Sequence, residues 1–436
     1  MLRLSNYLLI EKNNNGRYII FSTVTRAVVL LEEREFQRLS LGKTEGLFSE
    51  NEIEELIRKH ILVDKDLNED NYIDFELHYD RLTTKTFTSF VALSTLCNFS
   101  CVYCYEKGQV KKCNRMSHSD IDKLVKWYDE RLTAGDYDCC HVELYGGEPL
   151  LFFEDLCYFL NLLKKVLDRR SICLKLGMIS NGYLLDQEKA AYLANMGLEE
   201  IQITIDGIRE VHNSRRPLKT GAGTFDQILA NIQRNQGMGF TFVIRISFDD
   251  TNIQPARELI ACLDEYGLHE NILLYFAPIH QTIAQQESTY SFCSKAVITD
   301  DNTLLHTFAA LYSEAQARGY RIPYCYTDGP CMTVSKDSCL IAPDGGLYKC
   351  VEMIDEDELC IGNVFEGGYN SRYYDFVSAP VLKECLRKGC IFAPMCGGGC
   401  MMQAYMENHN CVTARCNRAF LEKMNRTLLL MNYRDS

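Results

Sequence analysis

Short apolar runs alternate with amphipathic segments through the middle of the chain. Six runs have the length and residue types of buried strands, and five segments between them carry apolar residues at helical spacing. The expected strands span 90–93, 141–145, 174–179, 201–205, 242–248 and 272–276, and the expected helices span 117–132, 154–167, 187–196, 225–236 and 254–266. Strands that alternate with helices pair in parallel through right-handed crossovers. The pattern predicts an α/β fold with an open or partial (β/α)6 barrel and its chemistry at the C-terminal ends of the strands.

Residues 1–82 carry a different pattern. Apolar runs at 7–10 and 18–21 flank the turn signal Asn13-Asn14-Asn15-Gly16 and predict two strands. One amphipathic helix is expected over 25–39. A second helix is expected after Ser49, because Glu52 lies three residues further on and completes a capping box. This segment is therefore expected to form a small separate domain.

The composition is that of an ordinary soluble globular protein, with 47% hydrophobic and 24% charged residues in a chain of 436. The sequence shows no apolar signal segment at its start and no run of about 18 apolar residues. We therefore expect a cytoplasmic protein that does not use a membrane. The net charge of −13 argues against nucleic acid as a partner, because binding to phosphates needs clustered Lys and Arg.

Cysteine is the unusual component of the chain, which contains 21 of them. In a large chain without a secretion signal, this abundance indicates metal or redox chemistry and not disulfides. Some cysteines are expected to be plain buried hydrophobic residues. Cys157, Cys173 and Cys262 are the candidates, because they lie inside apolar periodic segments.

The densest cysteine motif follows the first expected barrel strand. Cys97, Cys101 and Cys104 have the spacing C-x3-C-x2-C, with Tyr103 before the last cysteine. Three thiolates can hold three irons of a [4Fe–4S] cluster and leave the fourth iron open. Zinc sites use four ligands, usually from C-x2-C pairs, so a zinc knuckle or a chance spacing is the weaker interpretation. The motif resembles the catalytic cluster loop of radical S-adenosylmethionine (SAM) enzymes, and the resemblance places Tyr103 at the cofactor.

The end of the second expected strand carries Gly146-Gly147-Glu148-Pro149. Two glycines allow a close approach of the backbone, and the carboxylate of Glu148 can accept a hydrogen bond from an amine. This stretch resembles the motif that binds the amino group of SAM in the same family.

The later strand ends carry further residues of this resemblance. Ser180-Asn181-Gly182 follows the third strand, and Ile205-Asp206-Gly207 follows the fourth. The resemblance implies that Ser180, Asn181 and Ser247 contact SAM, and Arg245 is also expected at the cofactor because period-two alternation puts it on the face of Ser247. Asp206 either orients substrate or caps a turn. Arg215-Arg216-Pro217 is interpreted as a solvated basic loop, with a grip on peptide carboxylates as the alternative.

Cysteines become dense again from Cys325 onward, separated by Gly and Pro. The spacings C-x13-G-x4-C over 331–350 and C-x5-C-x3-C over 390–400 resemble the SPASM extension of radical SAM maturases, which holds two auxiliary [4Fe–4S] clusters. The resemblance implies a first auxiliary cluster on Cys331, Cys350 and Cys400, and a second one on Cys390, Cys396 and Cys416.

The fourth ligands of both auxiliary clusters stay open. The family pattern has C-x2-C before the five-residue step, but Arg387 stands at that position and the nearest cysteine is Cys385. Cys385 is the expected fourth ligand of the second cluster, with Cys411 as its rival. For the first cluster the fourth ligand is Cys325, Cys339 or no protein side chain.

The resemblance implies three domains. They are a winged-helix peptide-recognition domain over 1–82, with a structural cap as the alternative, a radical SAM barrel over 83–300 and a SPASM domain over 301–436. It also implies three [4Fe–4S] clusters, SAM, and an external one-electron reductant such as flavodoxin or ferredoxin. The expected activity is that of a maturase that generates a 5′-deoxyadenosyl radical and crosslinks a ribosomally made precursor peptide with a leader.

Within this activity a thioether is favoured slightly over a carbon–carbon bond. The reason is that a first auxiliary cluster with an open iron could bind a substrate thiolate, a ligand that suits iron–sulfur sites. Two other functions remain as alternatives: an anaerobic maturase that forms formylglycine in sulfatases, and an iron–sulfur electron-transfer protein. The motif at 146–149 and the barrel argue against the second alternative, because electron transfer needs neither.

Overall fold

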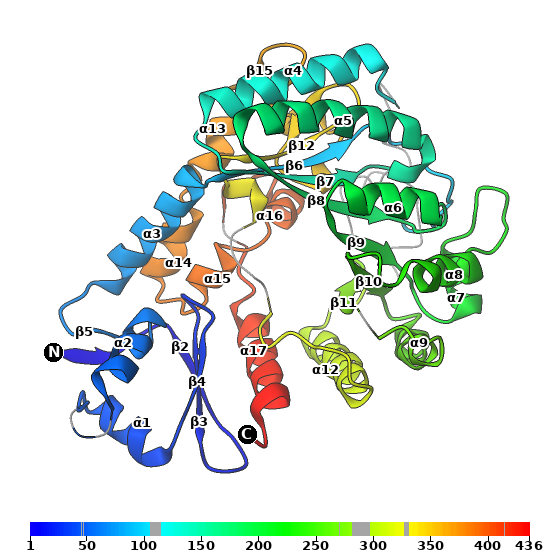
Figure 1. Cartoon of the computed structure of the whole chain (residues 1–436). Coiled ribbons are helices and arrows are strands. Elements are labelled where there is room, and N and C mark those ends of the chain that lie inside the picture. The colour runs from blue at the N-terminus through cyan, green and yellow to red at the C-terminus, as the bar shows by residue number, and fades with distance from the viewer. Residues whose placement is uncertain are drawn as a thin grey trace. The chain divides into compact units, whose positions relative to one another are not determined.

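The computed structural model describes residues 1–44, 46, 48–104, 115–269, 271–280, 297–326, 331–413 and 415–436. The chain divides into two compact units (Figure 1). The barrel unit contains Thr84–Ile322 and Lys336–Val377, and the terminal unit contains Met1–Thr83, Pro323–Ser335 and Ser378–Ser436. The terminal unit is therefore built from both ends of the chain.

Among the described residues, the barrel unit has one sheet of ten strands in the order β11-β10-β9-β8-β7-β6-β12-β13-β14-β15. The strands from β6 to β11 pair in parallel and in chain order. Their bounds are β6 Thr86–Ala92, β7 Cys139–Tyr145, β8 Cys173–Ser180, β9 Leu198–Thr204, β10 Thr241–Phe248 and β11 Ile272–Pro278. The six predicted strands and the predicted α/β fold are confirmed.

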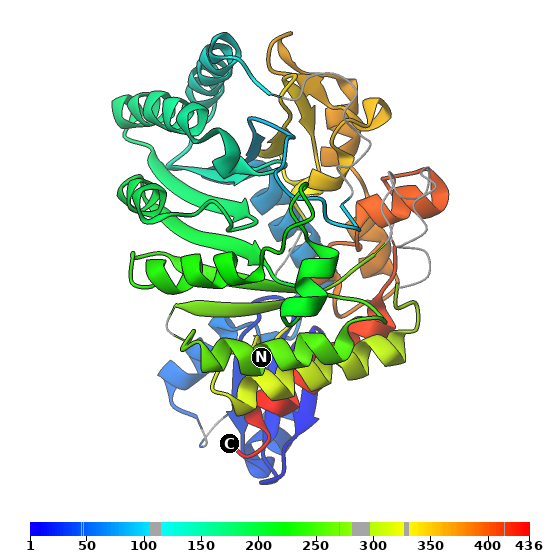
Figure 2. The ribbon, with the colours of Figure 1, turned by 90° about the vertical axis from the view of Figure 1, so that its right-hand side faces the viewer.

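Helices follow these strands in turn, and Figure 2 shows their succession from α4 and α5 to α9 and α12. Their bounds are α4 His118–Ala134, α5 Phe153–Arg170, α6 Gln187–Asn195, α7 Arg209–Arg215, α8 Phe225–Asn235, α9 Ile253–Glu265 and α12 Asp301–Ala317. The five helices expected from apolar spacing correspond to α4, α5, α6, α8 and α9. The short helix α7 and the helix α12 were not predicted.

Strand β10 shows how the sheet separates packing from chemistry. Phe242, Ile244 and Phe248 are fully buried, and the Phe248 ring meets the Phe308 ring of α12 edge-on at 5.3 Å between centroids. Arg245 and Ser247 lie on the opposite face and line a cavity. The alternation of side chains along a strand therefore gives one face to the core and the other to the site.

Residues after Lys336 extend the same sheet. Strand β12 (Ser338–Ile341) pairs in parallel with β6, and β13 (Gly346–Tyr348), β14 (Gly362–Asn363) and β15 (Gly368–Tyr369) follow in antiparallel order. The buried Asp337 accepts hydrogen bonds from Arg131 Nη2 at 2.7 Å and from the Tyr137 hydroxyl at 2.5 Å. These bonds join the start of β12 to α4 and β7, so the expected C-terminal extension over 301–436 is shared between both units.

The terminal unit begins with two small sheets. Strand β1 (Leu2–Leu4) pairs with β5 (Leu62–Asp64), and β2 (Leu8–Lys12), β3 (Tyr18–Ser22) and β4 (Val28–Leu31) form an antiparallel meander. The helices before Thr84 are α1 Glu33–Ser40, α2 Glu50–Arg58 and α3 Glu69–Thr83. The predicted cap of α2 is present, because Ser49 Oγ accepts from Glu52 N and the Glu52 carboxylate accepts from Ser49 N.

The helix predicted over 25–39 is wrong in its first half. The apolar run from Val28 to Leu31 is strand β4, which pairs with β3, and only Glu33–Ser40 is helical. The apolar spacing fits both structures, but β-branched Val28 and Val29 favour the strand. Glu32 then begins the helix, since its carboxylate and that of Glu35 complete a capping box.

The two ends of the chain share a hydrophobic core within the terminal unit. Leu9, Ile19 and Phe21 of the meander pack in one cluster with buried residues from the C-terminal segment, namely Phe392, Met395, Leu421 and Leu429. The helices that supply this segment are α14 Val381–Arg387, α15 Ala393–Cys396, α16 Met401–Asn408 and α17 Arg418–Tyr433. Residues 1–83 therefore depend on residues 386–429 for part of their packing.

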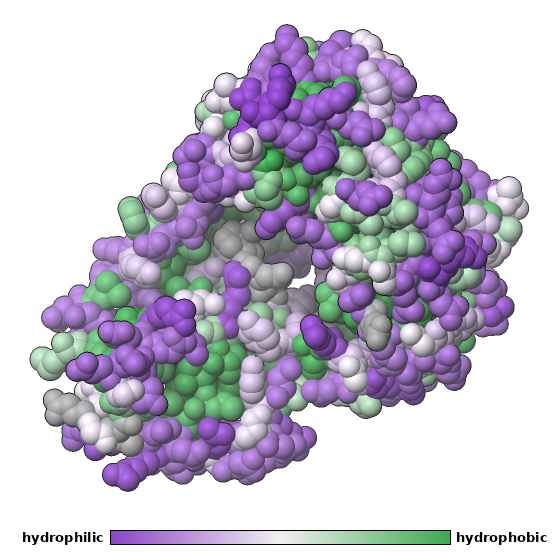
Figure 3. Space-filling model, in the orientation of Figure 1, coloured by the Kyte–Doolittle hydropathy of each residue, from purple (hydrophilic) through white to green (hydrophobic). Residues whose placement is uncertain are grey.

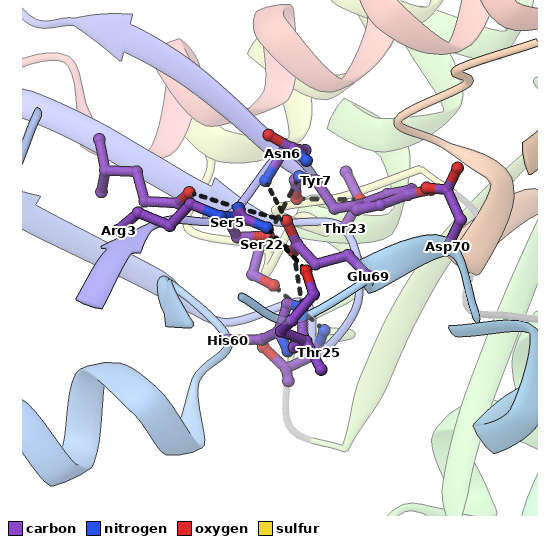
Figure 4. A network of polar contacts seen from close by, with 12 residues as sticks. Arg3, Ser5, Asn6, Tyr7, Ser22, Thr23, Thr25, His60, Glu69 and Asp70 are labelled. Carbon is purple, nitrogen blue, oxygen red and sulfur yellow. Dashed lines mark hydrogen bonds and ion pairs between the residues drawn. The ribbon is translucent and has the colours of Figure 1, made fainter. Parts of the chain in front are cut away.

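A buried carboxylate also holds the terminal unit together, as Figure 4 shows. Glu69, at the start of α3, is 2% exposed and accepts hydrogen bonds from Asn6 N at 2.9 Å, Arg3 Nη1 at 2.6 Å and the Ser5 hydroxyl. The ring of His60 lies 3.1 Å from the same carboxylate. Glu69 thus joins the segment from β1 to β2 to the start of α3.

The surface and the cysteines add two findings. Over the described ranges, no helix combines the length and the apolar character that crossing a bilayer requires, and polar side chains cover most of the face in Figure 3. Cys157 and Cys262 are half-buried and Cys173 is exposed, so the prediction that these three are buried hydrophobic residues is wrong. Cys173 is the first residue of β8, at the N-terminal end of an interior strand of the sheet, and its Sγ lies 2.9 Å from Cys139 Sγ.

Candidate active site

A cavity of about 380 Å³ opens at the C-terminal ends of the parallel strands, within the barrel unit. Its walls come from the loop after β6, from the ends of β7 to β11 and from the turn after β13. Catalytic sites of parallel α/β barrels lie at this end, because loops of many strands converge there. The cavity is therefore the candidate active site.

The three motif cysteines lie together in this cavity. Cys97, Cys101 and Cys104 all line it, and Phe99 N–H points to Cys97 Sγ at 3.3 Å. Burial raises the pKa of Cys97 to about 12, so its thiolate needs the charge of a metal to form at neutral pH. Among the described residues, no three His, Cys, Asp or Glu side chains converge on a single ion. A [4Fe–4S] cluster differs from such a site, because each cysteine binds a separate iron.

The glycines after β7 pack against the start of the cysteine loop. Gly146 has φ +118°, and a Cβ atom on it would collide with the Ser94 carbonyl, as one on Gly147 would with the Thr95 carbonyl. Both glycines line the cavity. Because the two glycines have no side chains, the end of β7 and the start of the cysteine loop can approach each other at the wall of the cavity.

Glu148 is placed differently from Gly146 and Gly147. It is fully buried and is not among the described residues that line the cavity, and neither is Pro149. Its carboxylate accepts from Leu150 N at 3.0 Å, from Ser180 Oγ at 2.8 Å and from Asn181 N at 2.7 Å. Glu148 thus fixes the end of β8, and its direct contact with the amine of SAM stays a prediction.

Asn181 carries this ordering on to the cysteine loop. Its Nδ2 donates to Asn98 Oδ1 at 2.8 Å and lies 3.8 Å from Cys97 Sγ. Ser180 and Asn181 are both 5% exposed and line the cavity. The motifs after β7 and β8 therefore meet at the first cysteine, as their shared position at strand ends implied.

Asp206, Arg215 and Arg216 belong to one buried network of hydrogen bonds. Asp206 is fully buried and accepts from the Tyr103 hydroxyl at 2.8 Å and from Arg215 Nε at 3.1 Å. Arg215 Nη2 donates to Asp249 at 2.8 Å, and Arg216 Nη1 donates to the Tyr103 hydroxyl at 2.8 Å. Arg215 and Arg216 are 4% and 9% exposed. The interpretation as a solvated basic loop is wrong, because Asp206, Asp249 and Tyr103 bind these guanidinium groups in the interior.

The cavity also contains a pair of residues that sequence analysis missed. His280 Nε2 and Glu352 Oε1 lie 2.8 Å apart, and both residues line the cavity with Tyr145, Arg245 and Ser247. The hydrogen bond with Glu352 raises the pKa of His280. His280 follows β11 directly and Glu352 lies two residues after Cys350, but 72 residues separate the two, so no local pattern could join them.

Arg245 also lines the cavity and leaves one donor unused. Its Nε is buried and has no hydrogen-bond partner within the described part of the chain. This donor and the hydroxyl of Ser247, which is 3% exposed, face the cavity from β10. Both residues are therefore placed where a carboxylate or hydroxyl of a bound molecule could meet them.

The terminal unit brings the cysteines predicted for the second auxiliary cluster near one another. Burial raises the pKa of Cys385 to about 11, and the thiols of Cys390, Cys396 and Cys416 raise it further. This mutual effect requires short separations between the four thiols. Cys385 is therefore favoured over Cys411 as the fourth ligand, and the assignment stays a proposal.

The cysteines predicted for the first auxiliary cluster are divided between the units. Cys331 and Cys400 belong to the terminal unit and Cys350 to the barrel unit, so their assignment stays a prediction. Cys339 is fully buried in β12, and this burial raises the pKa of its thiol to about 11. Cys325 packs with Cys390 and Cys396 against the core of the terminal unit. The burial of Cys339 in the sheet argues against it as the fourth ligand and leaves Cys325 or no protein side chain in that place.

Comparison with known proteins shows which proteins this chain is similar to. Residues 91–262 match the radical SAM superfamily. The chain is 23% identical over 339 residues to a cysteine-type anaerobic sulfatase-maturating enzyme of Clostridium perfringens, covering 70% of this chain and 86% of that protein. It is 25% identical over 331 residues to a mycofactocin maturase of Mycobacterium ulcerans, covering 71% of this chain and 81% of that protein.

A solved structure resembles the fold over almost the whole chain. SuiB of Streptococcus suis, bound to its precursor peptide SuiA, superposes with a TM-score of 0.55 at 14% identity, covering 96% of this chain and 99% of that chain. At this identity the likeness concerns the fold. It extends beyond the matched superfamily region to the terminal unit.

A radical SAM domain uses a [4Fe–4S] cluster and SAM, and the cavity residues fit both. Three cysteine thiols face the cavity without a disulfide among them, which suits three irons of a cluster. The unused Nε of Arg245 and the hydroxyls of Ser180 and Ser247 suit the carboxylate and ribose of SAM. Both kinds of donor line one cavity, so the cluster and SAM can bind side by side.

Proposed function

Because the chain is a radical SAM enzyme, we propose that it is a maturase that crosslinks residues of a ribosomally synthesised precursor peptide. The cavity that unites Cys97, Cys101 and Cys104 with polar residues of β10 and of the segment after β11 carries the proposal. The similarity to a sulfatase-maturating enzyme, a mycofactocin maturase and a precursor-bound SuiB supports a peptide as the substrate.

The residues of the cavity have distinct tasks in this proposal. When bound, the cluster and SAM supply a 5′-deoxyadenosyl radical, which removes a hydrogen atom from the substrate. Cys97, Cys101 and Cys104 hold the cluster. Ser180, Asn181 and Ser247 orient SAM, and Arg245 donates to it. The walls exclude water from the reacting groups.

The His280–Glu352 pair, which also lines the cavity, would meet the substrate there. Glu352 Oε1 is bound by His280, whereas Glu352 Oε2 is buried and has no hydrogen-bond partner among the residues described. A buried carboxylate oxygen without a partner is costly, so a donor from the substrate would stabilise it. This pair is therefore suited to hold an amide, hydroxyl or thiol of a peptide.

The fuller proposal includes two auxiliary clusters and a peptide leader. The mutual effect of Cys385, Cys390, Cys396 and Cys416 supports one auxiliary cluster, and the spacing of Cys331, Cys350 and Cys400 supports the other. A winged-helix leader-binding role is proposed for the part of the terminal unit before Thr84. The electron that reduces the cluster on Cys97, Cys101 and Cys104 would come from a flavodoxin or ferredoxin.

A thioether is the favoured product, and a carbon–carbon crosslink is its closest rival. Formylglycine formation in a sulfatase is the second candidate, favoured by the similarity to the sulfatase-maturating enzyme over most of both chains. The three products differ in what happens to cysteine. A thioether consumes one thiol and two hydrogen atoms, a carbon–carbon bond consumes hydrogen atoms alone, and formylglycine replaces the sulfur of a cysteine by oxygen.

The experiment uses full-length protein reconstituted without oxygen, which is expected to hold about 12 irons per chain if three clusters are present. It is incubated with SAM, dithionite and peptides encoded next to its gene. Mass spectrometry with and without thiol alkylation should show 5′-deoxyadenosine, and a peptide that has lost two hydrogens and one alkylatable cysteine per bond. Loss of hydrogens with every cysteine still alkylated would leave the carbon–carbon crosslink, and loss of sulfur would favour the sulfatase-type reaction.

A further inference from the structure

One buried cation in the cavity wall is not explained by its own partners. Arg216 is 9% exposed and lines the cavity together with Cys97, Cys101 and Cys104. Its Nη1 donates to the Tyr103 hydroxyl at 2.8 Å, but its Nε is buried and has no hydrogen-bond partner in the described part of the chain. A buried guanidinium with an unused donor indicates a missing acceptor.

The nearby carboxylates do not supply that acceptor. Asp206 and Asp249 are both bound by Arg215, through its Nε at 3.1 Å and its Nη2 at 2.8 Å. Arg216 reaches Asp206 only through the hydroxyl of Tyr103, which donates to Asp206 at 2.8 Å. The network is neutral when all its charges are counted, but its positive end is the one that faces the cavity.

The cysteine loop surrounds this positive end. The guanidinium of Arg216 lies 5.9 Å from the centroid of the Phe99 ring and interacts electrostatically with Cys101 and Cys97. Phe99 and Tyr103 lie two residues before and two residues after Cys101, so Arg216 contacts the loop on both sides of that cysteine. The charge is therefore fixed at the cysteines before any small molecule binds.

We propose that Arg216 is a positioning residue that holds a positive charge against the Cys101 side of the [4Fe–4S] cluster and so favours its reduced state. Reduction adds one electron to a cluster that three thiolates already make negative. A nearby cation in a poorly solvated site stabilises the added charge more than it stabilises the oxidised cluster. Hydrogen bonds to cluster sulfurs act in the same direction.

This inference rests on the radical SAM domain and is independent of the peptide substrate. Its rival is a role for Arg216 in binding the carboxylate of SAM, since the residue also lines the cavity. The two roles differ in one observable. A counter-charge to the cluster changes the reduction of the cluster without SAM, whereas a ligand of SAM changes only the affinity for SAM.

The test compares Arg216→Gln with Arg216→Lys in anaerobically reconstituted full-length protein without SAM. Samples are poised at fixed potentials with dithionite and mediators, and the reduced cluster is measured by electron paramagnetic resonance. The cluster of interest is the one whose signal changes when SAM is added afterwards. Arg216→Gln is expected to lower the reduced-to-oxidised ratio about tenfold, or about 59 mV for one electron, and Arg216→Lys is expected to recover most of it.

A matched control removes another cation of the same cavity. Lys219 lines the cavity. Lys219→Gln is expected to change the reduced-to-oxidised ratio less than about threefold, which corresponds to less than half of the potential shift for a tenfold change. An equal effect of both Gln variants, or an effect of Arg216→Gln below that threefold limit, overturns the proposal. Weaker SAM binding by Arg216→Gln with an unchanged ratio also overturns it and assigns Arg216 to SAM.

A second measurement needs no variant and keeps the proposal testable if Arg216→Gln does not assemble a cluster. Protein grown with ¹⁵N-labelled arginine is reduced without SAM, and pulsed electron paramagnetic resonance is used to detect nitrogen coupled to the cluster. A coupled arginine nitrogen is expected, because Arg216 lies against the loop. Its absence in a sample with a reduced cluster overturns the proposal.

Discussion

The two units each bury a network of carboxylates and arginines, and the two networks are completed in different ways. In the terminal unit, Glu69 is surrounded by donors from Arg3, Ser5 and Asn6 and by His60 (Figure 4). In the barrel unit, Asp206 and Asp249 are satisfied, but Arg216 keeps a donor without a partner at the cavity wall. A closed network stabilises a fold, whereas an open one leaves an interaction to be made with a ligand.

The difference follows from where each network lies in its fold. Glu69 joins the segment between β1 and β2 to the start of α3 and is not among the described residues that line the cavity. The Asp206 network lies at the C-terminal end of β9, where parallel barrels place their chemistry. Disrupting the first should therefore affect stability, and disrupting the cavity should affect activity.

The largest effect is expected from replacing Cys97, Cys101 and Cys104 together by Ala. SAM cleavage should fall to background, because no cluster can be held in the cavity, while the unfolding of the terminal unit should be unchanged. Production of 5′-deoxyadenosine measures the first effect, and urea unfolding measures the second. The matched control replaces half-buried Cys157 and Cys262, which lie in α5 and α9, and should keep full cleavage.

A triple variant that still makes 5′-deoxyadenosine would break the comparison, since the cavity would then not be the site of chemistry. A double control that loses cleavage as completely would also contradict it. In that case the loss would reflect damage to the fold and not the removal of iron ligands.

Replacing Glu69 by Gln should have the opposite effect and lower the stability of the terminal unit. The variant leaves the half-buried Arg3 beside a neutral side chain, and breaking an ion pair of a buried carboxylate costs about 3 kcal/mol. We expect urea unfolding to show that loss of stability for the terminal unit at pH 7. The control is Glu33→Gln, whose exposed ion pair with Lys12 should cost under about 1 kcal/mol.

The pH dependence identifies the charge of Glu69 as the cause. Burial alone would raise the pKa of Glu69, but hydrogen bonds from His60, Ser5, Asn6 and Arg3 outweigh it and lower the pKa from 4.5 to about 2. A lowered folded-state pKa gives stability above the unfolded value that is lost as the pH falls through the folded one. The difference between wild type and Glu69→Gln should therefore shrink between pH 4.5 and about 2; a constant difference would contradict this.

The same contrast explains how far the sequence predicts the molecule. Local patterns predict the strands and most barrel helices. They also predict the cavity residues of the cysteine loop, β7, β8 and β10, because each of these motifs consists of residues close together in the sequence. Gly146 and Asn181 could be assigned to the cavity in this way. The capping box of Ser49 and Glu52 was predictable for the same reason.

The missed features depend on partners far apart in sequence. Arg216 is buried against Tyr103, a partner that lies 113 residues away along the chain. His280 contacts Glu352, which is 72 residues away. A basic dipeptide or a lone histidine gives no local sign of such a partner. The predicted boundary of the N-terminal domain likewise could not reveal that Leu9 and Phe21 share a core with Leu421 and Leu429.

The smallest effect is expected at a network that is neither buried nor part of the cavity. Ser49 begins α2 with its hydroxyl 3.3 Å from Glu52 N, and Glu52 Oε2 accepts from Ser49 N at 2.7 Å. These contacts resemble those of Glu69 in kind, but water can replace them. Ser49→Ala should therefore cost about 1 kcal/mol, less than Glu69→Gln, with faster hydrogen exchange in α2 and no change in SAM cleavage. Ser40→Ala is the control, since Ser40 Oγ donates to Phe36 O at 2.8 Å at the end of α1 and caps no helix start. A cost for Ser49→Ala as large as for Glu69→Gln would mean that burial is not what separates the networks.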